Sequence, residues 1–347
     1  MPIVAGLGIS QTLAWASSYY LIAILAPAMG RDAGSSSTAV LGAFSAALLI
    51  SALMGPWVGR TIDRLGGREV LAVSNLVFAL GLGLLALASS FPVLALGWVV
   101  MGLGMGLGLY DAAFAALGRI YGHAARASIT GITLVAGFAS TIGWPLTAWG
   151  EVALGWRGTC LAWAIAHLFV GLPLNLLVLP RLRGAAAPSA ELAKPHVPMD
   201  RAMWLLGFAF AAGWVVSTAM AAHLPRLLEA AGASAAEAIA AAALVGPAQV
   251  AARMLEAGVL SRYHPLVSAR LSTLTHPIGA GLLLMGGGWL AIPFTLLHGA
   301  GNGILTIARG TVPLAVFGSK NYGYRLGLIG APARILQAGA PIAFGVL

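Results

Sequence analysis

The loop Gly59-Arg60-Thr61-Ile62-Asp63-Arg64-Leu65-Gly66-Gly67-Arg68 joins two long apolar runs, residues 38–58 and 69–88. Each run has about the 20 residues that a helix needs to cross the hydrocarbon core of a bilayer. Charged residues gather in the loop and are rare in both runs. The segment therefore predicts two membrane-spanning helices with a short charged loop between them at one membrane surface.

The composition of the whole chain fits this interpretation. Of its 347 residues, 59% are hydrophobic and only 8% are charged, and the mean hydropathy is +0.91. On a water-facing surface, about a quarter to a third of the residues are charged, so the composition excludes a soluble protein. The net charge of +9 does not indicate a nucleic-acid partner, because no polar face remains to present it. The single cysteine, Cys160, excludes an intrachain disulfide and a multi-cysteine metal site.

Eleven apolar runs of spanning length follow one another along the chain. They lack an alternation of period two, so we expect helices rather than strands. Six precede and five follow a polar linker at residues 181–201; the runs are 3–29, 38–58, 69–88, 92–115, 127–150, 157–180, 202–224, 236–259, 266–286, 288–309 and 324–347. The first run is too long, and too poor in basic residues at its start, for a cleavable signal peptide.

The basic residues favour one orientation in the membrane. With a cytoplasmic N-terminus, the inside loops hold 14 of the 19 basic residues, which obeys the positive-inside rule. We therefore expect a multi-pass integral protein of a bacterial cytoplasmic membrane, with its N-terminus and the 181–201 linker in the cytoplasm. The inside residues are Arg60, Arg64, Arg68, Arg119, Arg126, Arg181, Arg183, Lys194, Arg201, Arg262, Arg270, Arg309, Lys320 and Arg325.

A weak internal repeat relates the two halves at an offset of 196–199 residues. Six spans return the chain to the same side of the membrane, so the repeats are parallel. We expect six-helix halves at 1–180 and 202–347, the second truncated so that eleven of twelve helices are present. The four matches are Trp15-x-x-Ser18 with Trp214-x-x-Ser217, Gly59 with Gly258, Gly102-x-Gly104-x-Gly106 with Gly299-x-Gly301-x-Gly303, and Gly143-x-Pro145 with Gly339-x-Pro341.

The loop at 59–68 resembles the G-x-x-x-D-R-x-G-x-R signature between the second and third helices of major facilitator superfamily transporters. The basic position after Arg68 is Glu69 here, and the second copy, 258–262, lacks the acid; Gly155-Trp156-Arg157 also resembles the family. The resemblance implies an all-α transporter fold in which the loop latches the halves together. It assigns gating roles to Gly59, Asp63, Arg64, Gly66 and Arg68. The alternative is that the loop is only a glycine turn with orienting charges.

Two features of the N-terminal half differ from the drug/proton antiporters of this family. The arginine expected in the fourth helix aligns with Trp98, and the antiporter motif of the fifth helix is degenerate. Both features disfavour a drug/proton antiporter.

Ionisable residues inside a membrane are costly and are therefore functional candidates. Asp111, Arg253, Glu256 and Arg334 are such residues, and the repeat mates of Arg253 and Arg334 are apolar. The pattern is similar to the oxalate/formate antiporter and monocarboxylate transporter branches, in which cations on the eighth and eleventh helices bind carboxylates. Arg253 has the alternative of pairing with Glu256 three residues on, whereas no acid lies within a helical turn of Arg334.

A second charged pair is expected at the inner gate. Asp111 lies near the predicted inner end of the fourth span, and Arg309 lies within one residue of the matching position in the tenth. A salt bridge between them would close the cytoplasmic side. A helix cap, or local pairing with Arg119, is the alternative.

Other polar side chains in the spans could line a cavity or couple transport to an ion. Glu256, Asp111 and His298 are the coupling candidates; His167 and His276 lie at mid-span but more often such residues only bond to neighbouring helices. The cavity candidates besides Arg253 and Arg334 are Gln11, Trp15, Tyr19, Tyr20, Tyr110, Gln249, Asn302 and Gln337.

The sequence has no Walker loop, no His-Glu-x-x-His and no catalytic triad pattern, so we expect neither an enzyme nor a bound cofactor or metal. We expect a monomer in the bilayer that moves a small molecule by alternating access, coupled to a proton or a counter-anion, and an organic anion is the leading substrate class. The alternatives are a drug or metabolite exporter working as a proton antiporter and, from another class, a membrane receptor on a transporter scaffold.

Overall fold

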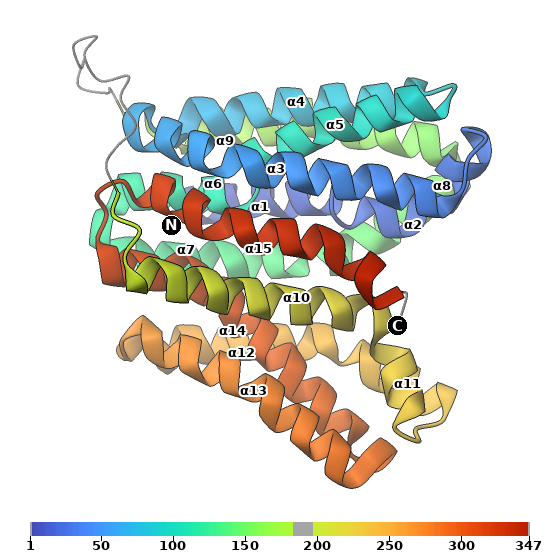
Figure 1. Cartoon of the computed structure of the whole chain (residues 1–347). Coiled ribbons are helices and arrows are strands. Elements are labelled where there is room, and N and C mark those ends of the chain that lie inside the picture. The colour runs from blue at the N-terminus through green and yellow to red at the C-terminus, as the bar shows by residue number, and fades with distance from the viewer. Residues whose placement is uncertain (1, 183–196, 346–347) are drawn as a thin grey trace.

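The computed structural model of the chain describes residues 2–182 and 197–345, here called the N-terminal half and the C-terminal half. The predicted linker at 181–201 lies largely outside the described residues. Secondary structure in both halves is helical (Figure 1). Among the described residues, seven helical stretches are long and apolar enough to cross a membrane, and some, such as the 88 residues of Phe91–Val178, are too long for one crossing. The all-α architecture is thus confirmed, while the eleven crossings stay a prediction.

The N-terminal half contains nine α-helices among its described residues, joined by three short helical turns. They are α1 (Pro2–Ala16), α2 (Leu21–Asp32), α3 (Ser37–Leu65), α4 (Gly67–Leu87), α5 (Phe91–Gly108), α6 (Tyr110–Tyr121), η1 (Gly122–Ala124), α7 (Ala125–Val135), η2 (Ala136–Phe138), α8 (Ala139–Ala166), η3 (His167–Gly171) and α9 (Leu172–Val178). Within α8, Gly155 has a φ of 71° and separates two helical segments.

The C-terminal half begins where Asp200 caps α10 by accepting a hydrogen bond from the Met203 N–H at 2.9 Å. Its described elements are α10 (Arg201–Ala230), α11 (Ala235–Ala243), α12 (Val245–Gly258), η5 (Leu260–Arg262), α13 (Pro265–Gly286), η6 (Gly287–Leu290), α14 (Ala291–Phe317) and α15 (Tyr322–Gly345). Ser234 and Glu237 form a reciprocal capping box at the start of α11.

Several helices run one or two turns beyond the predicted spans. The run 38–58 belongs to Ser37–Leu65, and the run 288–309 belongs to Ala291–Phe317. The predicted ends were wrong because hydropathy marks only the apolar part of a helix, whereas backbone hydrogen bonding continues into the polar region. Because the helices are longer than predicted, charged residues such as Asp63 and Arg309 lie within helices rather than in loops.

Helix breaks in the middle of the N-terminal bundle place the side chains of the site. The chain leaves regular helix at residues 17–20, between α1 and α2, and at Leu109, between α5 and α6. Gln11 donates a hydrogen bond from Nε2 to the carbonyl of Gly108 at 2.6 Å, which satisfies a backbone acceptor that the second break leaves free. Gln11 therefore stabilises the helix break at Leu109 and does not line the central pocket that is described below.

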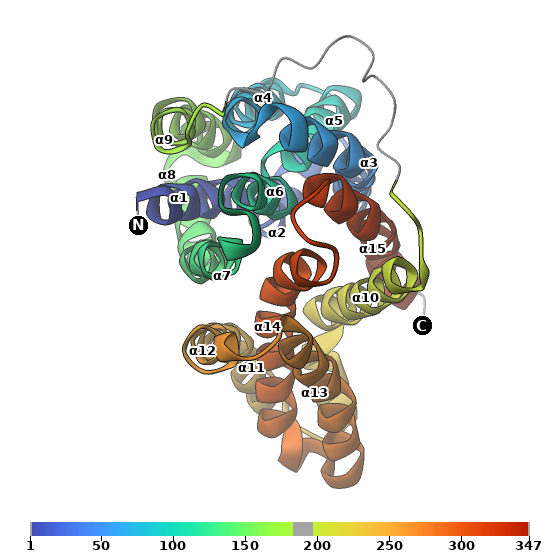
Figure 2. The ribbon, with the colours of Figure 1, turned by 90° about the vertical axis from the view of Figure 1, so that its left-hand side faces the viewer.

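The two halves meet mainly through α15, which packs against α3 of the N-terminal half and α10 of its own half, as the end-on view shows (Figure 2). We call the end of the molecule with Asp63, Arg126 and Tyr324 the Asp63 end. Contacts between the halves lie there and in the middle of the bundle. Toward the other end, α2 packs on α3 and α8, and α11 packs on α10, α12 and α14. The structure is thus closed at the Asp63 end.

Candidate functional site

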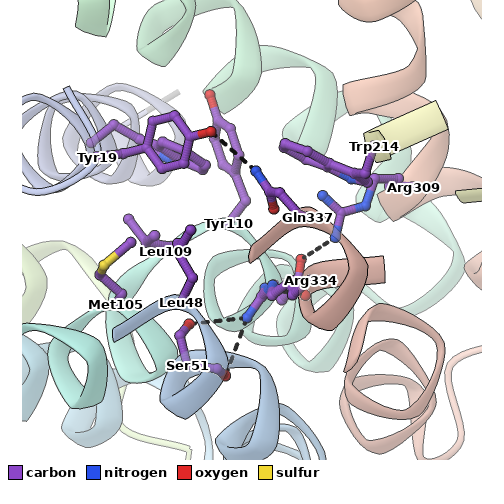
Figure 3. A pocket seen from close by; sticks show the side chains of 12 residues that line it. Tyr19, Leu48, Ser51, Met105, Leu109, Tyr110, Trp214, Arg309, Arg334 and Gln337 are labelled. Carbon is purple, nitrogen blue, oxygen red and sulfur yellow. Dashed lines mark hydrogen bonds and ion pairs between the residues drawn. The ribbon is translucent and has the colours of Figure 1, made fainter. Parts of the chain in front are cut away.

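A central pocket lies between the halves, at the level of the two helix breaks (Figure 3). The space among its lining residues is about 390 Å³, open solvent included. The lining residues are Trp15, Tyr19, Leu48, Ser51, Met105, Leu109, Tyr110, Asp111, Trp214, Arg309, Arg334 and Gln337. Both halves contribute to it, so a ligand there would contact both.

Asp111 is the acidic centre of the pocket. One carboxylate oxygen pairs with Arg309 at 3.4 Å, and the other pairs with Arg334. Arg334 also donates to the hydroxyl of Ser51 on α3 at 3.2 Å. Each of the three charged side chains is only 10–14% exposed, so their mutual pairing is needed to offset the cost of desolvation.

The position of Asp111 differs from the predicted one. The helix continues from Asp111 to Tyr121, a further ten residues or about 15 Å. Asp111 therefore lies in the central pocket and not at the inner end of its span. It pairs with Arg309 and Arg334 rather than with Arg119. The expected contact with Arg309 is present, and its gating role stays a prediction.

Positive charge exceeds negative charge around this pocket. Two guanidinium groups face one carboxylate, and a third, that of Arg253, lies apart from them on α12. Arg253 is buried and donates to the carbonyl of Thr133 at 3.3 Å and to Oε1 of Gln249 at 3.4 Å. It has no carboxylate at ion-pair distance among residues 2–182 and 197–345.

The alternative of an Arg253–Glu256 pair is wrong. Glu256 is fully buried and pairs with Arg126 of α7 at 2.9 Å, and it accepts hydrogen bonds from Thr130 at 3.3 Å and Ser268 at 3.5 Å. Arg126 also donates to two backbone carbonyls beyond the end of α12, those of Leu260 and Tyr263. From the sequence, Arg126 was expected only in an inside loop, because no local spacing links it to an acid 130 residues away.

We expect Glu256→Gln to weaken closure of the Asp63 end by about 1.5–3 kcal/mol, the usual contribution of a hydrogen bond to a charged group. Spin labels at Tyr121 and Arg262 would report the distance between the halves at this end. In the variant, the population with long distances should rise. Glu229→Gln, at an exposed position of α10, is the matched control. Unchanged distances in Glu256→Gln would show that the ion pair does not hold the halves together.

A second contact closes the Asp63 end on the side of α3. The Asp63 carboxylate accepts hydrogen bonds from the N–H groups of Gly323 at 2.9 Å and Tyr324 at 2.8 Å, at the start of α15. An acid at a helix N-terminus satisfies free N–H donors and complements the helix dipole. Gly59 lies beside Gly323 so closely that a Cβ atom would overlap the Gly323 carbonyl.

Arg68 does not link the halves as the resemblance implied. Its Nε donates to the carbonyl of Leu176 on α9 at 2.9 Å, and it pairs with Glu69 at 3.4 Å, both within the N-terminal half. The contact follows from its position in the first turn of α4, which faces α9. Gly66 ends α3 with a φ of 93°, which favours glycine. The gating role of Arg64 stays a prediction.

The remaining candidates lie away from the pocket lining. Asn302 accepts a hydrogen bond from Ser217, and His298 lies 5.2 Å from His276 between ring centroids. His167 is buried, with its ring nitrogens 2.7 Å from Ser17 and 2.9 Å from Asn75. It thus bonds to neighbouring helices, which is the structural role expected for most mid-span histidines. Coupling by His298 or Glu256 stays a prediction.

The chain matches the model of the Major Facilitator Superfamily over residues 7–347, and it belongs to that family. The fold is that of the membrane transporters of this superfamily. A 38 kDa protein from a 23S RNA operon of Thermoproteus tenax is 30% identical over 340 residues, covering 91% of this chain and 86% of that one. The fucose:proton symporter FucP of E. coli shares the fold, with a TM-score of 0.72 at 15% identity over 99% of this chain and 97% of FucP.

A further relative is the multidrug resistance protein B homolog of Mycobacterium tuberculosis. It is 32% identical over 164 residues, or 46% of this chain, and the match spans 29% of that protein's own length.

Proposed function

We propose that this protein is a secondary active transporter of a small organic anion, and that a carboxylate is the group it recognises. The excess of guanidinium over carboxylate around the central pocket is the observation that supports the proposal. Buried charge without a partner is costly, so a bound anion would complete the charge balance. Arginine suits this role because its planar fork binds a carboxylate by two parallel hydrogen bonds.

Arg309 is the guanidinium with the most free donors. Its one hydrogen bond within the described chain is the 3.4 Å contact with Asp111, and its face stacks 4.6 Å from the ring centroid of Trp214. Arg334, in contrast, already bonds to Asp111 and Ser51. We therefore expect the anion to bind Arg309 first and to weaken the ion pairs that both arginines form with Asp111.

Alternating access would follow from unequal contacts at the two ends. The Asp63 end is closed by Asp63 on α15 and by the Arg126–Glu256 pair, and we infer that the central pocket is reached from the opposite end in this state. Release to the other side requires both contacts to break while new contacts form. A proton could be coupled through Asp111, which loses its two cations when an anion takes them.

We infer from the basic loops that the Asp63 end faces the cytoplasm. A cysteine replacing Ser261, beyond α12, should therefore react with a membrane-impermeant maleimide only after the cells are opened. A cysteine replacing Trp289, which is 95% exposed at the opposite end, should react in intact cells. The native Cys160 is buried and should give no background. The reverse pattern of labelling would contradict the orientation.

Flux into liposomes tests the transport proposal. Purified protein is reconstituted, and uptake of labelled carboxylates is measured with and without an imposed pH gradient. We expect uptake of at least one organic anion above that of protein-free liposomes. Stimulation by the gradient would support proton coupling, whereas stimulation by a preloaded anion would support exchange. Absence of flux for every anion tested would contradict the proposal.

A drug exporter is the second candidate, and the M. tuberculosis relative supports it. Trp98, which takes the place of the arginine expected in such exporters, is fully buried and lies 5.3 Å from Phe44 between ring centroids. The position is therefore part of the apolar core. Proton-driven efflux of a cationic dye from the same liposomes, without anion transport, would favour the exporter.

A further inference from the structure

The walls of the central pocket are aromatic on both sides. Trp15 of α1 lies 5.4 Å from Tyr19 and 5.1 Å from Tyr110 between ring centroids, which makes an aromatic cluster in the N-terminal half. Trp214 of α10 lines the same pocket from the C-terminal half, with Arg309 stacked on it (Figure 3). Trp15 and Trp214 are repeat mates, so each half presents an indole from the corresponding helix.

Few hydroxyl and amide groups of the pocket are free to form hydrogen bonds with a hydroxyl-rich ligand. The amide of Gln337 donates to the hydroxyl of Tyr19 at 3.1 Å, and the hydroxyl of Ser51 is engaged by Arg334. A ligand with many hydroxyl groups would find these hydroxyl acceptors already engaged, so its O–H donors would lose bonds to water without replacing them. The pocket thus suits a ligand with one charged group and an apolar body.

The charge balance limits the ligand to one negative charge. Asp111 neutralises one of the two guanidinium groups that line the pocket, which leaves one positive charge. The indole N–H groups of Trp15 and Trp214 are buried without a hydrogen-bond partner in the described chain. Such donors are costly, and a ligand acceptor beside either of them would remove the cost.

We propose that the pocket binds a monoanion with a flat aromatic body, of the arylcarboxylate class, with its carboxylate on Arg309 and Arg334 and its ring against Trp15 and Trp214. Aromatic rings pack favourably on indoles in stacked and edge-to-face arrangements. The proposal rests on the anion transport proposed above and specifies the body of the anion.

Titration of the purified full chain tests this inference by thermal shift, which reports binding to the folded state. The probes are benzoate, cyclohexanecarboxylate, acetate and gluconate. We expect benzoate to bind at least about tenfold more tightly than acetate, because burying a ring contributes about 1.5–3 kcal/mol. Cyclohexanecarboxylate should be intermediate, and gluconate should bind no more tightly than acetate.

Variants of Trp214 separate ring contact from positioning of Arg309. Trp214→Ala should weaken benzoate about tenfold and leave acetate unchanged, and Trp214→Phe should retain most benzoate affinity. Trp289→Ala, at a position that is 95% exposed, is the matched control. The aromatic body of the ligand would be contradicted if acetate or gluconate bound as tightly as benzoate, or if Trp214→Ala weakened benzoate and acetate equally. Either result would leave the proposal of anion transport unaffected. Failure of all four probes to bind the parent protein would contradict both proposals.

Discussion

Arg334→Gln is expected to lose anion binding and transport while remaining folded in the membrane. Arg334 lines the central pocket and bonds to Asp111 and Ser51. Truncating one side of a desolvated charge pair costs about 2–5 kcal/mol, which corresponds to a loss of about 30-fold to several thousand-fold in affinity. Asp111 keeps Arg309 as a partner at 3.4 Å, so the variant does not leave a buried carboxylate without a cation.

The measurement combines anion titration by thermal shift with uptake into liposomes. Arg334→Lys should retain part of the binding, because it keeps the charge and loses only the fork of donors. Arg226→Gln, at an exposed position of α10, is the control for loss of a positive charge. If Arg334→Gln binds anions as tightly as the parent, the carboxylate hypothesis is wrong and the exporter becomes the better candidate.

Gly59→Ala is expected to open the Asp63 end, because one methyl group forces α3 and α15 apart. The added Cβ would meet backbone atoms of Gly323 and Tyr324, which cannot move aside as a flexible side chain can. Overpacking costs about 1–3 kcal/mol, occasionally more, and at the upper value the closed population falls about 150-fold relative to the open one. Gly59→Ala should therefore accumulate the state that is open at the Asp63 end.

Gly258→Ala provides the matched control for this variant. Gly258 is the repeat mate of Gly59, yet a Cβ there meets no atom within 4 Å in the described chain. Spin labels at Tyr121 and Arg262 should move apart in Gly59→Ala and keep the parental distance in Gly258→Ala. Equal behaviour of the two variants would contradict a special role for the contact between α3 and α15.

Much of the fold could be predicted because its signals are local. Apolar runs of spanning length predicted the helices, and the loop at 59–68 predicted the family that the chain belongs to. The repeat was informative about the site as well, since its anchors Trp15 and Trp214 both line the pocket. Helix ends were less predictable, because hydropathy falls before backbone hydrogen bonding stops.

The partners of the charged residues could not be predicted by the same reasoning. Local spacing suggested Arg253 with Glu256, but Glu256 pairs with Arg126 instead. Arg68 was expected to join the halves, and it bonds to α9 of its own half. On one helix, residues three or four apart can meet, but packing between helices decides whether a nearer partner from elsewhere displaces that contact.

The sequence alone determined that this protein is a helical membrane protein with a charged loop of the transporter family and with arginines inside its spans. Hydropathy and motif spacing are properties of neighbouring residues, so folding does not alter them. Only the tertiary structure decided that Asp111 lies in the central pocket between Arg309 and Arg334, which are 198 and 223 residues away. That arrangement depends on the helix break at Leu109, which forms within the N-terminal half, and on the packing of α15 against α3, which arises only when the two halves come together.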